Sequence, residues 1–406
     1  MKKSNLFLLL LMALIVMSCS KDETTMSIPQ ESNAIEFGTY VGRDAQTRAP
    51  VLDDAALKGT KDYYKDGFGV FAHYTGTTAY ATPTTTPNFM YNQQVKFADS
   101  KWGYTPVKYW PNNTGDLVSF FAYAPYGNTN IDVANAAVGD PALTFTVNGT
   151  VKDQADLVWG VNETGGLPFL NQTKQSITGD IKFTFKHALA RIGFNVEAMV
   201  DLVNTEGTGT TPDGDTANGT TDGATKIVVT QVQLIGKFYE SGVLNLNSTA
   251  TSTTPIVSVP NWGTLLLPED LEERTFELNA TGSNFADATD VGFDDLAKTF
   301  GQDVTNAKEK LNADDSYLMV IPQAFADNKI KIRVTYDVIT KDDDLGTGQS
   351  KVKNVITSDE FTFDFAGGKA YTFNLHLGMT SVKFDADVTG WDEQTGTVVN
   401  VPINTN

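Results

Sequence analysis

Cys19 is the residue whose position most directly predicts a covalent reaction. It is the only cysteine in the chain, and it follows a basic head at residues 2–3 and an apolar run from Leu6 to Met17. Such a run, closed by a small residue, is typical of a secretory signal. Val16-Met17-Ser18-Cys19 has the form of a lipobox, in which the thiol receives a diacylglycerol and becomes the new N-terminus. We therefore predict a signal peptide over residues 1–18 and lipidation of Cys19.

One alternative to lipidation stays open, which is a plain signal peptide followed by an incidental cysteine. A membrane-spanning helix does not fit, because a span needs roughly 20 apolar residues and this run is shorter.

Other side chains capable of chemistry are scattered. The three histidines, His73, His187 and His376, are far apart in the sequence and fall in or beside apolar strands, which is typical of structural histidines. The sequence has no His-Glu-x-x-His motif, no phosphate-binding glycine loop with its lysine and no Gly-x-Ser-x-Gly elbow. With Cys19 lipidated, no thiol remains for nucleophilic catalysis. We predict no catalytic residue, no cofactor and no metal site.

Acidic side chains leave two alternatives open. Carboxylates are so frequent that a glycosidase-type pair is conceivable, although no pair stands out. Asp342-Asp343-Asp344 offers the oxygen ligands that calcium prefers, but a solvated turn between two strands is the favoured interpretation.

Charge and length narrow the class of protein. The chain has 30 Lys and Arg against 49 Asp and Glu, a formal net charge of −19. Such a surface repels nucleic acid and anionic lipid, so neither is a predicted partner. The length suggests two domains. With its single cysteine lipidated, the chain has no disulfide, and its stability must come from buried apolar surface.

The elements that must position any site are strands. Thr, Gly, Asn and Asp are abundant, and β-branched and aromatic residues cluster in short runs, which predicts an all-β protein with many turns. One stretch, residues 293–311, has helical spacing instead. The predicted strands are 34–41, 67–73, 118–123, 142–147, 156–161, 181–185, 191–196, 227–238, 317–321, 329–339, 351–365, 371–377 and 381–388.

Two predicted strands near the ends of the chain are unusually apolar on one face. On the first strand this face carries Ile35, Phe37, Thr39 and Val41. Near the C-terminus the corresponding face carries Val399, Val401 and Ile403. Pro402 inside the latter stretch favours an edge position, and a strand this apolar needs a partner sheet.

Five motifs occur in order along most of the chain. They are Tyr109-Trp110-Pro111 leading to Phe120-Phe121-Ala122-Tyr123-Ala124-Pro125; Asp156-Leu157-Val158-Trp159; Phe185-Lys186-His187-Ala188-Leu189-Ala190-Arg191-Ile192 followed by Phe194; Leu318-Met319-Val320-Ile321-Pro322-Gln323; and Gly368 to Leu377. Together, behind a lipobox, they resemble the fimbrillin family of Bacteroidota, the subunits of type V pili and their lipoprotein relatives. Ser20-Lys21-Asp22-Glu23 likewise resembles the tag that sends lipoproteins of that phylum to the cell surface, with a simple polar tether as the alternative.

The resemblance implies two β-sandwich domains in tandem with transthyretin-like topology. It predicts a signal peptide over 1–18, a lipidated propeptide with the first strand over 19–48, an N-terminal sandwich over 49–178 and a C-terminal sandwich over 179–406.

The resemblance also implies a role for the first strand. In family members that polymerise, an arginine-specific protease on the cell surface cuts the lipoprotein precursor and removes the tether with this strand. Thr47-Arg48-Ala49 fits that position, so the cut is predicted between Arg48 and Ala49. Arg43 is an alternative site, and an ordinary solvated arginine is another interpretation.

Removal of the first strand exposes an apolar groove and unpaired backbone groups, which are a template for an added strand. Residues 397–403 are the candidate donor strand, with residues 381–388 as a further strand beside them. Implied partners are other pilin subunits in a homopolymer or a mixed fibre, the arginine-specific protease, and the outer membrane through the lipid of the precursor.

The implied function is a structural pilin subunit of an adhesive surface fimbria, not an enzyme. It begins as a lipid-anchored precursor on the outer membrane and ends in the fimbrium. One alternative is a surface lipoprotein that does not polymerise, either a pilus anchor or tip or a glycan-binding protein. A hydrolase with carboxylate catalysis is a further alternative. A glycan-binding protein could use as stacking platforms the tryptophans Trp102, Trp110, Trp159, Trp262 and Trp391.

Overall fold

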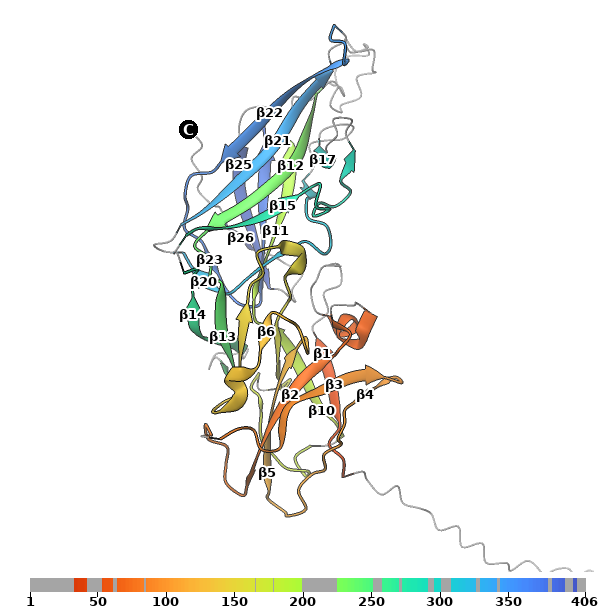
Figure 1. Cartoon of the computed structure of the whole chain (residues 1–406), viewed down its shortest axis with the longest axis vertical. Coiled ribbons are helices and arrows are strands. Elements are labelled where there is room, and N and C mark those ends of the chain that lie inside the picture. The colour runs from red at the N-terminus through yellow and green to blue at the C-terminus, as the bar shows by residue number, and fades with distance from the viewer. Residues whose placement is uncertain are drawn as a thin grey trace, which may run out of the picture. The chain divides into compact units, whose positions relative to one another are not determined.

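The computed structural model divides the chain into two compact units, Met1–Ala34 and Ile35–Asn406. The strands belong to the second unit, which is drawn in Figure 1. The structure describes residues 33–41, 53–60, 64–83, 85–164, 166–177, 179–198, 225–250, 258–269, 272–290, 296–300, 308–325, 329–341, 344–378, 382–390 and 397–399.

The first sheet contains most strands from the N-terminal half of the chain. Its strands are hydrogen-bonded in the order β1-β10-β8-β5-β2-β3-β4, and β9 pairs with β5. Central strands such as β5 are buried on both faces, so they are continuously apolar instead of alternating. The bounds are β1 Phe37–Val41, β2 Phe68–Gly76, β3 Met90–Ala98, β4 Lys101–Gly103, β5 Leu117–Ala124, β8 Val158–Val161, β9 Phe169–Gln172 and β10 Ile181–His187.

The second sheet covers one face of the first. Its order is β14-β13-β7-β6. Leu143 and Phe145 of β7 share a hydrophobic cluster with Phe121 and Tyr123 of β5, so the two sheets form a sandwich. The other face of the first sheet has a hydrophobic cluster of its own. The bounds are β6 Ile131–Asp132, β7 Ala142–Thr146, β13 Ser241–Ala250 and β14 Ser258–Leu266.

The third and fourth sheets form a second sandwich. The orders are β18-β11-β24-β25-β26, with β19 on β11, and β16-β17-β12-β21-β22, with β15 on β12. The hydroxyl of Tyr336 on β21 donates across the sandwich to the Gly378 carbonyl, 3.0 Å away. The bounds are β11 Ala190–Ala198, β12 Thr225–Gly236, β15 Arg274–Asn279, β16 Thr289–Asp290, β17 Leu296–Phe300, β18 Glu309–Lys310, β19 Leu318–Val320, β21 Ile330–Lys341, β22 Gln349–Thr357, β24 Lys369–Leu377, β25 Val382–Gly390 and β26 Thr397–Val399.

The predicted all-β class with β-sandwich layers is confirmed. Short elements complete the described part of the chain: the strand pair β20 (Gln323–Ala324) and β23 (Asp364–Phe365), and the single turns η1 (Ala56–Thr60), η3 (Ala134–Ala137) and η4 (Val151–Asp153). None of the helices in the described segments is long and apolar enough to cross a membrane.

The helix predicted over residues 293–311 is wrong where the structure describes that stretch. Leu296–Phe300 is strand β17, which pairs with Ile227–Val229 of β12, and Glu309–Lys310 is strand β18 on β11. The helical spacing was misleading because these strands are short, and so few residues do not separate a period of 3.6 from a period of two.

The domain boundary near residue 178 stays a prediction. Strand β10, which begins at Ile181, pairs with β1 and β8 of the first sheet, and β11 pairs with β24 of the third. The chain therefore passes from one sheet to another between His187 and Ala190, inside the motif that carried much of the resemblance.

Candidate functional site

Strand β1 presents a buried face made by the alternation in its sequence. Ile35, Phe37 and Val41 are 1%, 5% and 2% exposed, whereas Tyr40 on the opposite face is 44% exposed. Thr39 on the buried side donates from its hydroxyl to Asp54 Oδ1 over 3.0 Å. The period of two therefore places the four residues identified from the sequence toward one cluster.

Strand β1 pairs with β10 along one edge, and Ile35, which precedes the strand, is bonded on the other side. On one edge it runs parallel to β10, with Phe37 opposite Ile181 and Val41 opposite Phe185. On the other edge, the amide of Ile35 donates to the carbonyl of Lys108 over 2.9 Å. Strand β1 therefore forms the end of the first sheet beside β10 (Figure 1), and a single backbone bond ties its start to Lys108.

Phe37 lies at the centre of an aromatic pocket. Its ring centroid is 5.3 Å from Tyr104, 6.0 Å from Phe183, 6.1 Å from Phe120 and 6.3 Å from Phe68. The rings of Phe68 and Phe120 meet it edge-on, a favourable arrangement for aromatic pairs. These four residues come from separate segments of the chain, so they meet only because the first sheet brings them together.

Tyr104 fastens the start of β1. Its hydroxyl donates to the Ile35 carbonyl over 2.8 Å and accepts from the Lys108 amide over 3.2 Å. Burial raises the pKa of the Tyr104 hydroxyl, and the backbone hydrogen bond at Lys108 opposes that shift. The hydroxyl therefore keeps its proton at neutral pH and remains a donor to β1.

The arrangement can hold a strand and needs no reactive group to do so. Each large side chain of β1 that is buried contributes roughly 1.5–3 kcal/mol. If β1 left, these contributions would be lost and the facing edge of β10 would present unpaired backbone groups. An edge of this kind takes up another strand readily.

The other candidate residues fall partly within the described part of the chain. Val399 belongs to β26, which pairs antiparallel with β25, and its partner is Ala386. Val401 and Ile403 lie outside the described residues, as do Cys19, Arg48, Ala49 and Trp391. The structure therefore places the beginning of the candidate donor strand on the edge of the third sheet, and it leaves the processing and lipidation predictions untested.

The histidines lie in separate places. Nδ1 of His187 is 2.9 Å from Asp156 Oδ2 in a buried pair, and Nδ1 of His376 is 2.9 Å from Glu197 Oε2. His73 is buried under the ring of Tyr80. Among the described residues no group of three potential metal ligands comes together.

The described tryptophans do not form a flat exposed row. Trp110 and Trp159 are buried. Trp102 lies against Phe68 at 5.0 Å, and the indole N–H of Trp262 donates to the Ala188 carbonyl over 3.1 Å. These rings are part of the packing, so the observation that would favour a glycan platform is not found among them.

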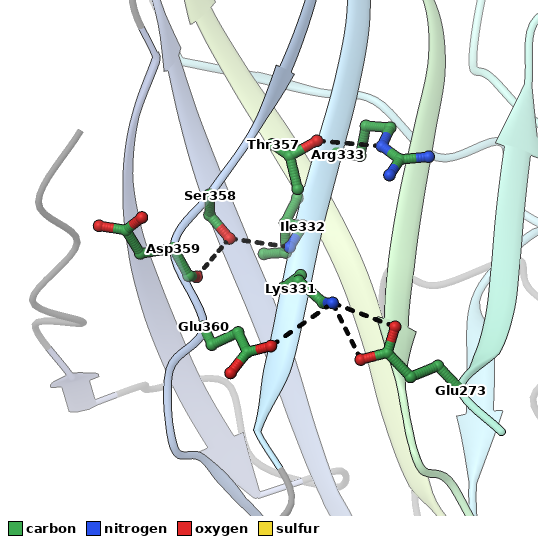
Figure 2. A network of polar contacts seen from close by, with 8 residues as sticks. All are labelled: Glu273, Lys331, Ile332, Arg333, Thr357, Ser358, Asp359 and Glu360. Carbon is green, nitrogen blue, oxygen red and sulfur yellow. Dashed lines mark hydrogen bonds and ion pairs between the residues drawn. The ribbon is translucent and has the colours of Figure 1, made fainter. Parts of the chain in front are cut away.

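A second cluster of polar side chains forms a network on the fourth sheet. Lys331 Nζ lies 2.9 Å from Glu273 Oε1 and 3.5 Å from Glu360 Oε1, and Ser358 Oγ accepts from the Ile332 amide over 3.0 Å (Figure 2). The hydrogen bond to Glu273 is the main cause of a raised pKa of Lys331, so the amine stays protonated and is no nucleophile. The network fixes the chain after β22 against β21.

Sequence reasoning missed the residues that hold β1 from outside it. Tyr104, Lys108 and Asp54 give no periodic signal, because each lies in a loop or a single turn. Alternation did locate Phe183 in a strand, but the pairing of that strand with β1 depends on sheet order, which local pattern does not encode.

Comparisons with known proteins give a consistent result. The sequence model of a family described as fimbrillin-like matches residues 47–391. A fimbrium subunit, Fim1C of Phocaeicola vulgatus, is 27% identical over 97% of this chain and 98% of its own length. A crystal structure of a fimbrial protein from Bacteroides vulgatus has a TM-score of 0.60 and 24% identity, covering 88% of this chain and 99% of that one.

Proposed function

This chain belongs to the fimbrillin-like family, and from that premise we propose that it is a structural subunit of an adhesive surface fimbria. It is exported as a lipoprotein precursor with diacylglycerol on Cys19, which holds it on the outer membrane. An arginine-specific surface protease cuts between Arg48 and Ala49. The cut frees β1, and a donor strand from another subunit replaces it.

The observation that carries the proposal is the way β1 is bound. It is a short strand near the start of its compact unit, it pairs with β10 along one edge while Ile35 before it is bonded to Lys108, and its apolar face lies in a hydrophobic core. Between Val41 and Asp53 lies a segment that contains Arg48. A single cut there separates β1 from the body of the protein without interrupting any other strand that the structure describes.

The family match supports the same division. The matched residues 47–391 leave out both β1 and the segment 397–403. The family model therefore begins beside the proposed cut and ends before the candidate donor strand, while the fimbrium subunit relative aligns over 97% of the chain. Donation requires Thr397–Val399 to leave β25, on which they lie in the uncut chain.

The role proposed is mechanical, and no catalytic step is assigned to any residue of the chain. We propose a propeptide over 19–48 and sandwich domains over 49–178 and 179–406, with β10, β13 and β14 from the second stretch completing the two sheets of the first sandwich. In the assembled state the protein is part of a cell-surface fimbrium.

Native proteolysis tests this function. The purified chain from Ser20 onward keeps every residue that the structure describes, and it is treated with trypsin while mass and oligomeric state are followed. We expect cleavage after Arg48 followed by SDS-resistant ladders, and loss of the ladders when residues 397–406 are deleted. Clean cleavage after Arg48 that leaves a stable monomer would refute polymerisation and favour an anchor or a monomeric surface protein.

A further inference from the structure

We propose that the groove occupied by β1 prefers a donor strand with a large aromatic side chain at the position of Phe37, so that residues 397–403 of a copy of this chain bind it more weakly than such a strand. The inference rests on the proposed function, because it names the strand that replaces β1. It names the side chain that separates a strong donor strand from a weak one at this joint.

The pocket for Phe37 is made to the size of an aromatic ring. Phe68, Phe120 and Phe183 are fully buried around it, and Phe37 itself is 5% exposed. Phe183 stacks on it with an interplanar angle of 18°, and Phe68 meets it edge-on at 88°. A ring in this position therefore contacts the pocket on several sides at once.

The walls of the pocket are held from behind, so they cannot close on a smaller side chain. Phe68 lies against Trp102 at 5.0 Å and against Phe185 at 5.5 Å. Phe120 lies against Trp110 at 5.8 Å. Close-packed walls that are fixed in this way leave a cavity when the side chain between them shrinks.

The candidate donor strand over residues 397–403 has no side chain of that size, whereas residues 381–388 beside it include Phe384. Residues 397–403 read Thr-Val-Val-Asn-Val-Pro-Ile, and residues 392–406 contain no aromatic residue. Whatever the register and whichever face turns inward, the position of Phe37 receives an isoleucine at most. Because a void remains, such a strand should bind at least about tenfold more weakly than one with an aromatic residue there.

A competition experiment measures this preference. In the chain from Ser20, a site for a sequence-specific protease replaces residues 44–50, and Ser32→Cys carries a fluorophore that reports release of β1. After cutting, unlabelled peptides compete for the groove. The first set is the peptide of residues 33–43, its Phe37→Val variant, and its Tyr40→Ala variant as the matched control. The second set is the peptide of residues 394–405 and its variants Val399→Phe and Val401→Phe.

We expect the 33–43 peptide and its Tyr40→Ala control to displace β1 with similar potency. Phe37→Val and the 394–405 peptide should be at least about tenfold weaker, and one of the two phenylalanine substitutions should recover much of that loss. If the 394–405 peptide competes as well as 33–43, the inference is wrong and strand exchange stands. If no peptide, including 33–43, exchanges with β1, both the inference and the proposed function fail.

A graft in the uncut chain keeps the test independent of how the cut protein behaves. Residues 35–41 are replaced by the sequence of residues 397–403, with and without phenylalanine at position 37. We expect the graft with phenylalanine to unfold at a clearly higher urea concentration than the graft without it. Equal unfolding midpoints would overturn the aromatic preference.

Discussion

Phe37→Ala is expected to be the most destabilising single substitution in β1. Truncation of a buried phenylalanine in a protein core costs about 3–5 kcal/mol. Phe37 is 5% exposed and touches four other rings. Because those rings are packed from behind, little relaxation is available, and we expect a loss of about 3–4 kcal/mol in the free energy of unfolding of the uncut chain.

The matched control is Tyr40→Ala, which removes an aromatic ring from the same strand. Tyr40 is 44% exposed on the opposite face, so its loss should cost no more than about 1 kcal/mol. Both variants of the chain from Ser20 are unfolded in urea and followed by tryptophan fluorescence, since Trp110 lies in the same cluster as Phe37. Equal losses in the two variants would refute the view that β1 is held by its buried face.

Three further predictions concern other parts of the chain. Burial lowers the pKa of His73 from its ordinary value of 6.5, with Asp140 opposing the shift; the unfolded chain then binds the proton more readily, so stability falls as the pH drops below about 6.5. In the His73→Phe variant, the urea midpoint of unfolding should fall less at low pH than in the unsubstituted chain. An unchanged pH profile would contradict this role of His73. Arg48→Ala should abolish the processing cut while Arg43→Ala leaves it in place, as read from the mass of the secreted product; the reverse pattern would move the site to Arg43. Cys19→Ala should abolish incorporation of labelled palmitate and the attachment of the precursor to the outer membrane, and persistent labelling would point to another acceptor.

Alternation was a reliable guide where a strand is buried on one face only. The predicted face of residues 34–41 is the face that the structure buries, and the prediction of β25 from the alternation at 381–388 matches its observed span of Val382–Gly390 closely. In both cases one side of the strand meets a core and the other does not, so the sequence has to alternate.

Prediction from the sequence pattern failed for very short strands and for strands of polar composition. Strands β13 and β14, Ser241–Ala250 and Ser258–Leu266, were not predicted, because Ser, Thr, Asn and Gly interrupt their apolar positions. Strand β17 was mistaken for part of a helix, since five residues can satisfy a period near 3.6 by chance.

The pocket around Phe37 could be predicted only in part. The residues of β1 and β10 were each placed in strands, but parallel pairing between them joins segments far apart in the sequence. The contribution of Tyr104 depends on a loop conformation that brings its hydroxyl to the Ile35 carbonyl. Such long-range register and loop geometry follow from the packing of the whole sheet, not from local spacing.

A redox-reversible lock on β1 tests the central claim most directly. Tyr40 and Thr184 are cross-strand partners on β1 and β10, and the chain from Ser20 has no cysteine of its own, so Tyr40→Cys with Thr184→Cys creates one disulfide at a separation that such bonds span. The account predicts that the oxidised protein, cut after Arg48, stays monomeric and forms SDS-resistant polymers only after reduction. Polymers that form equally well with the disulfide intact would show that β1 need not leave, and would contradict strand exchange at this groove.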